Sequence, residues 1–262
     1  MNIQIVYPND GWILKRYGDE ILKYYPGYKG MTMEPDLEQE WDVTYFINYA
    51  LYKPVPKSKL VGAYFTHREG QSFELIAFNC DFCVSMSDKY AEFLKEHNDR
   101  VFKIWPGVDL DMFRPKMRIG IMGRHYGSGR KGEDWIERLK EIDFLEVVHA
   151  KGQFRYEDMP MFYNLCDYIL ILSRIEGGPM SIVEGLACGK EIISSDVGMA
   201  KEFKNVRIYD RDNFDSLKNI LVELGKKRAL IRAEVMKTSW KDFADGHHKL
   251  FGELLNEKAG KD

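Results

Sequence analysis

Two carboxylates, Glu176 and Glu184, lie eight residues apart on either side of a Gly-Gly-Pro turn. The apolar run at 168–172 predicts a buried parallel strand, and residues 180–188 predict the helix that follows it. Backbone N–H groups at such a helix start, together with the helix dipole, favour a diphosphate. The pattern therefore indicates a diphosphate-binding turn, made of Gly177, Gly178, Pro179, Met180 and Ser181.

The two carboxylates suit hydroxyl ligands, because an ionised carboxylate only accepts hydrogen bonds and vicinal hydroxyls donate them. We expect Glu176, in the loop, to bind hexose hydroxyls and Glu184, one turn into the helix, to bind a ribose diol. Two alternatives stay open. Ser181 and Glu184 also fit a capping box that would tie down the helix start, and a lone Glu176 would ordinarily be a solvated loop residue.

Three cations precede this turn in the sequence: Arg124, Arg130 and Lys131. Arg124 follows a predicted strand at 117–122, so its guanidinium would project from the carboxyl end of that strand and fork onto phosphate oxygens. Lys131 adds a point charge, and Arg130 competes with it for this role. Such cations stabilise negative charge on a departing diphosphate, whereas the alternative is a solvated Arg-Lys turn.

Strand-like and helix-like segments alternate along the chain, which favours a doubly wound α/β architecture. We expect two domains, residues 1–113 and 114–262, with ligands bound at the carboxyl ends of the parallel strands. Strands are expected at 2–7, 41–48, 59–66, 82–86, 117–122, 145–150, 168–172, 191–195 and 206–209, with 101–105 closing the first half. Helices are expected at 12–25, 88–97, 133–142, 159–166, 180–188, 213–225 and 240–256.

The charge balance argues against some partners. The chain has 38 basic and 41 acidic residues, a formal net charge of −3, so no global field draws it onto nucleic acid or an anionic membrane. No run of 18 apolar residues occurs, and the amino terminus opens as a strand rather than as a signal peptide. We expect a soluble cytoplasmic protein without a transmembrane segment, and we leave open a peripheral association with a membrane.

No metal site is expected from the sequence. A single Cys-x-x-Cys pair is weak support for zinc, so the cysteines are interpreted as packing thiols in a reducing compartment. The Asp-x-Asp sequences at 109–111 and 210–212 imitate a metal-binding motif but lack its context, since the first lies between the two expected domains and the second follows a late strand near the carboxyl end. The cysteines are Cys80, Cys83, Cys166 and Cys188.

Several of these segments resemble the family 4 retaining glycosyltransferases. The Glu-x7-Glu pattern at 176–184, followed by Gly-Leu-Ala-Cys-Gly at 185–189 and by residues 191–198, is similar to the carboxyl-terminal signature of that family. Residues 107–115 are similar to its interdomain Asn-Gly-Val-Asp-x-x-x-Phe-x-Pro segment, although Pro106 replaces the Asn. Gly123-Arg124 with Lys131-Gly132 resembles its pair of diphosphate-binding cations. The resemblance covers roughly residues 60–250.

The resemblance implies the GT-B fold, in which two Rossmann-like domains face each other across a cleft and a final helix, here near 240–256, crosses back onto the amino-terminal domain. It also implies metal-independent transfer of a hexose, with retention, from a nucleoside diphosphate sugar to an acceptor hydroxyl. Its catalytic residues would be Glu176, Arg124 and Lys131, together with His67, which matches a strand-end histidine of the family. Gly11 would lie in a turn near the phosphate and the acceptor.

The acceptor is not identified by these motifs. A glycan, a lipid-linked sugar, a small molecule or a nucleobase all remain open, as do the donor base, the sugar and the oligomeric state. The amino-terminal domain is unusually short for the family, which implies a trimmed acceptor surface. Two alternatives to a transferase are a GT-B sugar-nucleotide epimerase or hydrolase, and a non-catalytic accessory subunit that binds a sugar nucleotide.

Overall fold

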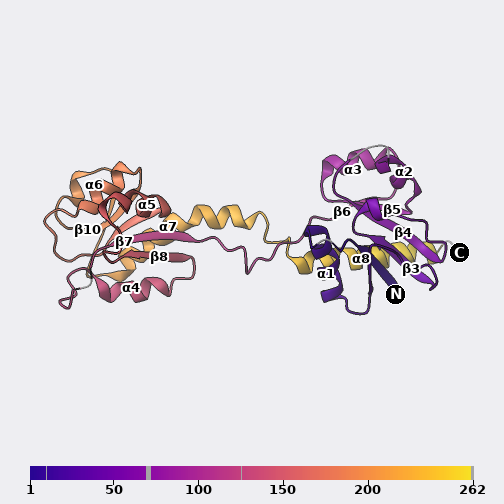
Figure 1. Cartoon of the computed structure of the whole chain (residues 1–262), viewed down its shortest axis with the longest axis horizontal. Helices are drawn as coiled ribbons and strands as arrows, with labels where there is room; N and C mark the ends of the chain where they lie inside the picture. Colours follow the sequence, from indigo (N-terminus) through magenta and orange to yellow (C-terminus); the bar gives the residue numbers. More distant parts are fainter. Residues whose placement is uncertain (10, 69–71, 125, 261–262) are drawn as a thin grey trace. The chain divides into compact units, whose positions relative to one another are not determined.

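The computed structural model describes residues 1–9, 11–68, 72–124 and 126–260. The chain divides into two compact units, shown in Figure 1, each of which contains one parallel sheet. The first unit is Met1–Phe113 together with Val235–Asp262, and the second is Arg114–Glu234.

The first unit has a six-stranded sheet in the order β2-β1-β3-β4-β5-β6, with every neighbouring pair parallel. Strand β1 is buried along its whole length, as expected for a strand that is covered on both faces. The strands are β1 (Ile3–Tyr7), β2 (Lys29–Thr32), β3 (Trp41–Phe46), β4 (Ser58–Phe65), β5 (Phe82–Ser85) and β6 (Val101–Lys103).

Helices cover both faces of this sheet. Helices α1 (Ile13–Tyr24) and α8 (Trp240–Ala259) pack into the apolar core on one face. Helices α2 (Ser72–Asn79) and α3 (Asp88–Lys95) pack on the other face (Figure 1), where the short 3-10 helix η1 (Tyr49–Leu51) also lies. The carboxyl-terminal helix α8 is thus part of the core of the first unit.

The sequence of helix α8 determines both where the helix begins and which of its faces is buried. A capping box between Ser239 and Asp242 satisfies backbone donors at its first turn. The residues spaced for one face are all buried: Trp240, Phe243, His247, Phe251 and Leu254. His247 is a packing residue, since its Nδ1–H donates to the Phe243 carbonyl at 2.8 Å and its Nε2 accepts from the Tyr45 hydroxyl at 3.0 Å.

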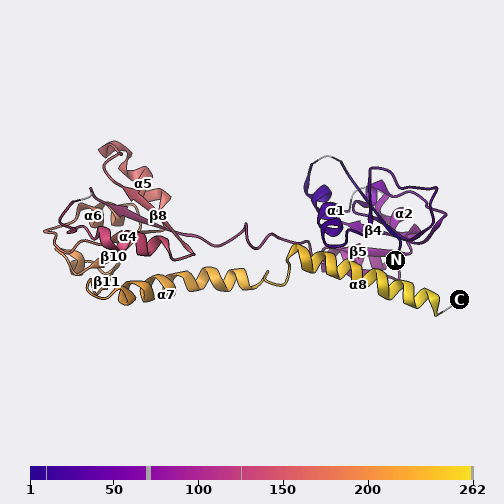
Figure 2. The ribbon, with the colours of Figure 1, turned by 90° about the horizontal axis from the view of Figure 1, so that it is seen from below.

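The second unit has a five-stranded parallel sheet in the order β11-β10-β9-β7-β8. Its strands are β7 (Met117–Met122), β8 (Leu145–Ala150), β9 (Tyr168–Ile171), β10 (Glu191–Ser195) and β11 (Val206–Tyr209). Helices α4 (Glu133–Lys140) and α7 (Phe214–Ala233) cover one face, and α5 (Met159–Leu165) and α6 (Met180–Ala187) cover the other. Two 3-10 helices, η2 (Tyr156–Asp158) and η3 (Ala200–Glu202), complete the unit. Figure 2 shows α7 running along one side of it.

The expected fold class of two Rossmann-like α/β halves is confirmed, with three corrections to the elements. Strand β2 and helix α2 were not predicted, since both are short and neither has a strong periodic pattern. Helix α7 continues to Ala233, beyond the expected end at 225. The residues after Gly225 are mostly strong helix formers. The free energy gained by continuing the helix through them exceeds the free energy that the one glycine costs. In the described part of the chain, no helix has the length and apolar character needed to cross a membrane.

The buried imidazole of His247 predicts a pH-dependent stability. Burial lowers the pKa of His247 to about 4, whereas an unfolded histidine titrates near 6.5. Between these values the unfolded state binds more protons, so the free energy of unfolding rises with pH. This contribution is present at pH 7 and is lost as the pH falls through about 6.5 towards 4, and it amounts to at most about 3 kcal/mol.

We therefore expect the pH dependence of the unfolding free energy, measured by urea titration across this range, to flatten in His247→Asn. The slope is the readout, because lost packing lowers stability at every pH. Leu250→Ala, which removes packing from the same helix without removing a titratable group, serves as the control and should keep the wild-type slope. A wild-type slope in His247→Asn would contradict the assignment.

Candidate active site

The predicted site residues of the second unit gather where the order of its strands reverses. The chain passes from β7 to β8 in one direction, and the later strands β9, β10 and β11 add on the other side of β7. Connections diverge at such a point, and open α/β sheets bind ligands there, beyond the carboxyl ends of the strands. The loop at 123–132 follows β7, and the loop at 172–179 follows β9.

These two loops are held against each other. The Arg174 N–H donates to the Arg130 carbonyl at 2.8 Å. Gly132 has a positive φ of 81°, and a Cβ placed there would lie 2.3 Å from the Leu172 carbonyl oxygen. Only glycine fits both the backbone conformation and this close approach. The residue next to Gly132, Lys131, is thereby brought beside the second loop.

Lys131 and Glu176 form an ion pair across the two loops. Glu176 Oε1 accepts from the Lys131 ammonium and also from the Ser173 hydroxyl, the latter at 2.9 Å. The two side chains are largely enclosed, with 22% of Lys131 and 16% of Glu176 exposed. The aliphatic stem of Lys131 passes over Gly123, where an added Cβ would lie 3.6 Å from Lys131 Cδ. An ammonium has three donors, so this pairing leaves Lys131 able to bind a further oxygen.

The other two predicted cations lie apart from this pair. Arg124 is exposed, and its side chain passes close to Gly152, where an added Cβ would lie 3.5 Å from Arg124 Nε. Arg124 makes no ion pair with any residue that the structure describes. Arg130 is also exposed and stacks over the Tyr126 ring at 4.4 Å. Of the two adjacent cations, Lys131 therefore faces the second loop.

The Gly-Gly-Pro turn is supported from the loop after β10. Gly198 has a positive φ of 49°, and a Cβ there would lie 2.5 Å from the Gly177 carbonyl oxygen. Gly178 lies close to Met199, whereas a Cβ at Gly177 would meet nothing within 4 Å. Helix α6 then begins at Met180 without a side-chain cap. The amino terminus of α6 thus has no side-chain cap, and the space beside Gly177, just before it, is open.

Glu184 faces helix α5 instead of capping α6. Its Oε2 accepts from the Tyr163 hydroxyl at 2.5 Å, and α6 has no side-chain cap, so the alternative of a capping box with Ser181 is wrong. Ser181 is buried. Burial and the Glu184 carboxylate raise the pKa of the Tyr163 phenol well above its ordinary value, which keeps it a donor. Glu184 is therefore oriented by a hydrogen bond that comes from another helix.

A cavity of about 330 Å³ opens beside Glu184. Its lining is mostly apolar, with the Glu184 and Glu157 carboxylates as its charged groups. This is the composition expected for a small-molecule pocket, where a few polar groups orient the ligand within apolar walls. The lining residues are Tyr156, Glu157, Met159, Pro160, Tyr163, Glu184, Ala187 and Cys188.

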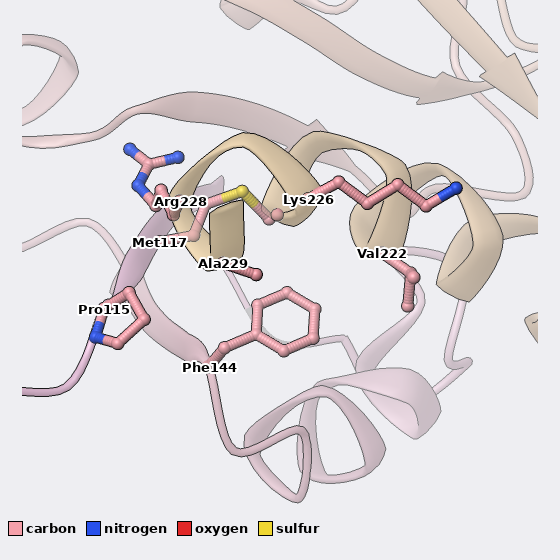
Figure 3. Close-up of a pocket in the computed structure, with 8 residues that line it drawn as sticks. Pro115, Met117, Phe144, Val222, Lys226, Arg228 and Ala229 are labelled. Atoms are coloured by element: carbon pink, nitrogen blue, oxygen red, sulfur yellow. The ribbon is translucent and has the colours of Figure 1, made fainter. Parts of the chain in front are cut away.

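A second cavity, of about 210 Å³, lies beside the amino end of β7. Figure 3 shows Met117, Phe144, Val222 and Ala229 around it, beneath helix α7. Met117 begins β7, so this cavity lies at the amino ends of the strands. None of the predicted site residues lines it.

The two remaining predicted site residues belong to the first unit. Gly11 follows β1, has a positive φ of 69° and precedes Trp12, the N-cap residue of α1. His67 follows β4, and its Nδ1 lies 2.8 Å from the Thr66 hydroxyl, while its ring meets the Tyr49 ring edge-on at 5.7 Å. Both thus lie beyond the carboxyl ends of strands of the first sheet.

The acidic pairs that imitate a metal motif make backbone turns. Asp109 Oδ1 accepts from the N–H groups of Asp111 and Met112 at 3.0 and 2.9 Å, and Asp210 Oδ1 accepts from that of Asp212 at 3.0 Å. In the residues described, no three His, Cys, Asp or Glu side chains gather in a way that could hold a metal ion. All four cysteines are free thiols, and three of them are buried.

Three supporting residues were missed by the sequence reasoning: Tyr163, Ser173 and Gly198. Ser173 could have been found, since it is the first polar residue after an apolar strand and lies three residues before Glu176. Gly198 was part of the quoted 191–198 segment, but its role against Gly177 depends on a positive φ. Tyr163 gave no signal, because its partner is 21 residues away on another helix.

The close approach at Gly132 can be tested by substitution. Gly132→Ala combines a positive φ with a clash against a backbone carbonyl, so we expect it to lower the free energy of unfolding by about 2 kcal/mol or more. Gly127→Ala, in the same loop, is the matched control because a Cβ there meets nothing within 4 Å. It should stay within about 0.5 kcal/mol of wild type. Equal stabilities of the two variants in urea unfolding would contradict this packing.

The chain is similar in sequence to known glycosyltransferases. Residues 100–206 match the family model described as "Glycosyl transferases group 1". An uncharacterized glycosyltransferase of Methanocaldococcus jannaschii is 24% identical over 76% of this chain. The match spans 65% of that relative, so the chain covers less than two thirds of its length.

Among solved structures, a lipopolysaccharide outer core galactosyltransferase in its apo form is 11% identical, with 97% of this chain and 100% of that one covered and a TM-score of 0.42. A sucrose-phosphate synthase from Thermosynechococcus elongatus is also 11% identical, with coverages of 98% and 100% and a TM-score of 0.39. The family match is the more specific finding. The residues that match the glycosyl transferases group 1 model, 100–206, include Lys131, Glu176 and Glu184.

Proposed function

We propose that this protein is a retaining glycosyltransferase of family 4 that moves a hexose from a nucleoside diphosphate sugar to an acceptor hydroxyl without a metal. The observation that carries the proposal is the Lys131–Glu176 pair at the reversal point of the second sheet. It joins a phosphate-binding cation to a hydroxyl-binding carboxylate, beside an uncapped helix start. The family match over residues 100–206 supports the same enzyme class.

The donor diphosphate would bind between the helix start and the cations. The amino terminus of α6, approached through Gly177 and Gly178, supplies backbone N–H groups and the positive end of the dipole. Lys131 supplies an ammonium, and Arg124 supplies an exposed guanidinium that can bind two phosphate oxygens. As the bond to the sugar breaks, negative charge grows on the diphosphate, and these groups stabilise it.

The hexose would be oriented by Glu176. Both of the contacts that fix this carboxylate, from Lys131 and from Ser173, are made to Oε1. Oε2 is thereby left to accept from sugar hydroxyls. The ammonium of Lys131 also offsets the repulsion between Glu176 and the nearby phosphates, which allows a carboxylate and a diphosphate to occupy one site.

The nucleoside would occupy the cavity beside Glu184. Tyr163 holds Glu184 Oε2, and Oε1 is left for the ribose diol. The apolar walls of the cavity, which include Tyr156 and Met159, suit the face of a base. The donor is therefore bound along one line, from the base near η2, through the ribose at Glu184, to the hexose at Glu176.

Retention of configuration would follow from attack on the same face of the sugar from which the diphosphate departs. The leaving phosphate, held by Lys131 and Arg124, would take the proton of the acceptor hydroxyl, so the reaction needs no covalent nucleophile. His67 and Gly11 remain proposed site residues of the first unit, His67 as a catalytic residue and Gly11 in a turn for the donor. The acceptor is proposed to carry a hydroxyl and is otherwise unassigned.

Substitution of the donor-binding groups tests the proposal. Glu176→Ala, Lys131→Ala and Arg124→Ala should each lower the rate of transfer by about 10²-fold or more, because each removes a group that stabilises the reacting charge or holds the sugar. Lys140→Ala is the matched control, since Lys140 makes an exposed ion pair with Glu137 at 2.7 Å in the same unit.

Donor consumption and glycosylated product would be followed by chromatography, with and without EDTA, for a panel of nucleoside diphosphate sugars and acceptors. Near-normal rates in all three variants would refute the site, and loss of activity in EDTA would refute metal independence. Product formed from the donor alone would favour an epimerase or hydrolase instead.

The role of Tyr163 gives a separate test of the nucleoside pocket. Tyr163→Phe keeps the ring but removes the donor to Glu184, so binding of a nucleoside diphosphate should weaken by about tenfold, the value of one hydrogen bond to a charged group. Pyrophosphate, which has no ribose, should bind the variant and the wild type equally in calorimetry. An equal loss for both ligands would show that Glu184 does not bind the ribose.

A further inference from the structure

Arg211 is a buried cation behind the loops of the candidate site. It is the central residue of the Asp-x-Asp sequence that follows β11, and only 9% of its side chain is exposed. Its Nε donates to the Leu172 carbonyl at 2.8 Å, and its Nη2 donates to Asp134 Oδ1 at 2.6 Å. The guanidinium also stacks over the Trp135 ring at 4.0 Å. One side chain thus joins the end of β9 to the first turn of α4.

The two residues that Arg211 contacts lie close in sequence to Glu176 and to Lys131. Leu172 directly precedes Ser173, whose hydroxyl donates to Glu176. Asp134 lies three residues after Lys131, in the first turn of α4. The carbonyl that Arg211 binds is also the one against which Gly132 packs. Arg211 therefore contacts the segment that carries Lys131 and the segment that carries Glu176, but it contacts neither of these two residues.

The charge of Arg211 makes this arrangement specific. A buried guanidinium is costly unless its donors are satisfied. Partners from two different elements satisfy Nε and Nη2 of Arg211, whereas its buried Nη1 has no hydrogen-bond partner among the residues that the structure describes. Arg174 adds to the same network, through Asp134 at 3.6 Å and Asp212 at 3.0 Å. A lysine could keep the ion pair with Asp134, but one ammonium cannot reproduce the planar fork and the stacking on Trp135.

We propose that Arg211 is a positioning residue of the donor site. It holds the first turn of α4 against the end of β9 and so sets the separation between the Lys131 ammonium and the Glu176 carboxylate. What that separation serves, diphosphate and hexose binding, rests on the function proposed above. The positioning itself does not depend on that function and can be measured without a donor.

The first measurement is amide hydrogen exchange in Arg211→Lys. The Arg174 N–H, which donates to the Arg130 carbonyl across the two loops, should exchange about tenfold faster than in wild type, as expected when a local opening becomes easier. Arg207→Lys is the matched control. Arg207 lies on β11, the strand that precedes Arg211, and pairs with Glu191 and Glu223, away from both loops. Equal exchange of the Arg174 amide in the two variants would overturn the proposal.

The second measurement is a double-mutant cycle on the binding of a nucleoside diphosphate, by calorimetry. Arg211→Lys should weaken binding about tenfold in the wild-type background and should have little further effect in Lys131→Ala, because residues that act through one another are not additive. Losses that add fully would show a general structural role and would also overturn the proposal.

Asp134→Asn removes the same ion pair from the α4 side, together with the ion pair between Asp134 and Arg174. It therefore repeats only the binding measurement where Arg211→Lys does not fold. If the wild type binds no nucleoside diphosphate, the proposed function fails, and the exchange measurement still decides the role of Arg211.

Discussion

The approach of Gly132 to the carbonyl of Leu172 is the constraint on which the candidate site depends. The contact is shorter than any side chain would allow, and it places the loop after β7 directly against the loop after β9. The pairing of Lys131 with Glu176, 45 residues apart in sequence, follows from it. Without this approach Lys131 and Glu176 would be solvated loop residues, which is the alternative that the sequence left open for each of them.

The site balances opposite charges within a small space. In the proposed function, a carboxylate that binds sugar hydroxyls would repel the donor diphosphate, and the ammonium between the loops would offset that repulsion. Behind it, the guanidinium of Arg211 is itself balanced by Asp134. The same acidic residue is shared with Arg174. The buried guanidinium of Arg211 is thus paired with a half-exposed carboxylate, and removing that carboxylate would leave a buried charge without its ion-pair partner.

Most of the fold could be predicted from the sequence, because buried parallel strands read as continuous apolar runs. The strand at 168–172 and the helix at 180–188 were found to within a residue. The misses have a physical cause in each case. Strand β2 is a short edge strand with little alternation, and α7 continued through Gly225 because its neighbours are good helix formers. The Ser181–Glu184 spacing fitted a capping box, but the Glu184 carboxylate instead accepts a hydrogen bond from the Tyr163 hydroxyl of α5.

The sequence by itself determined the residue types of the site and the loops that carry them, since strand, turn and helix signals are local. It could not determine which of Arg130 and Lys131 faces Glu176, which group orients Glu184, or that Arg211 lies behind the loops. Those depend on contacts between residues 21 to 77 positions apart, which only close packing brings together. Tertiary structure decided them because a buried charge or hydroxyl is held by whichever partner the neighbouring element supplies.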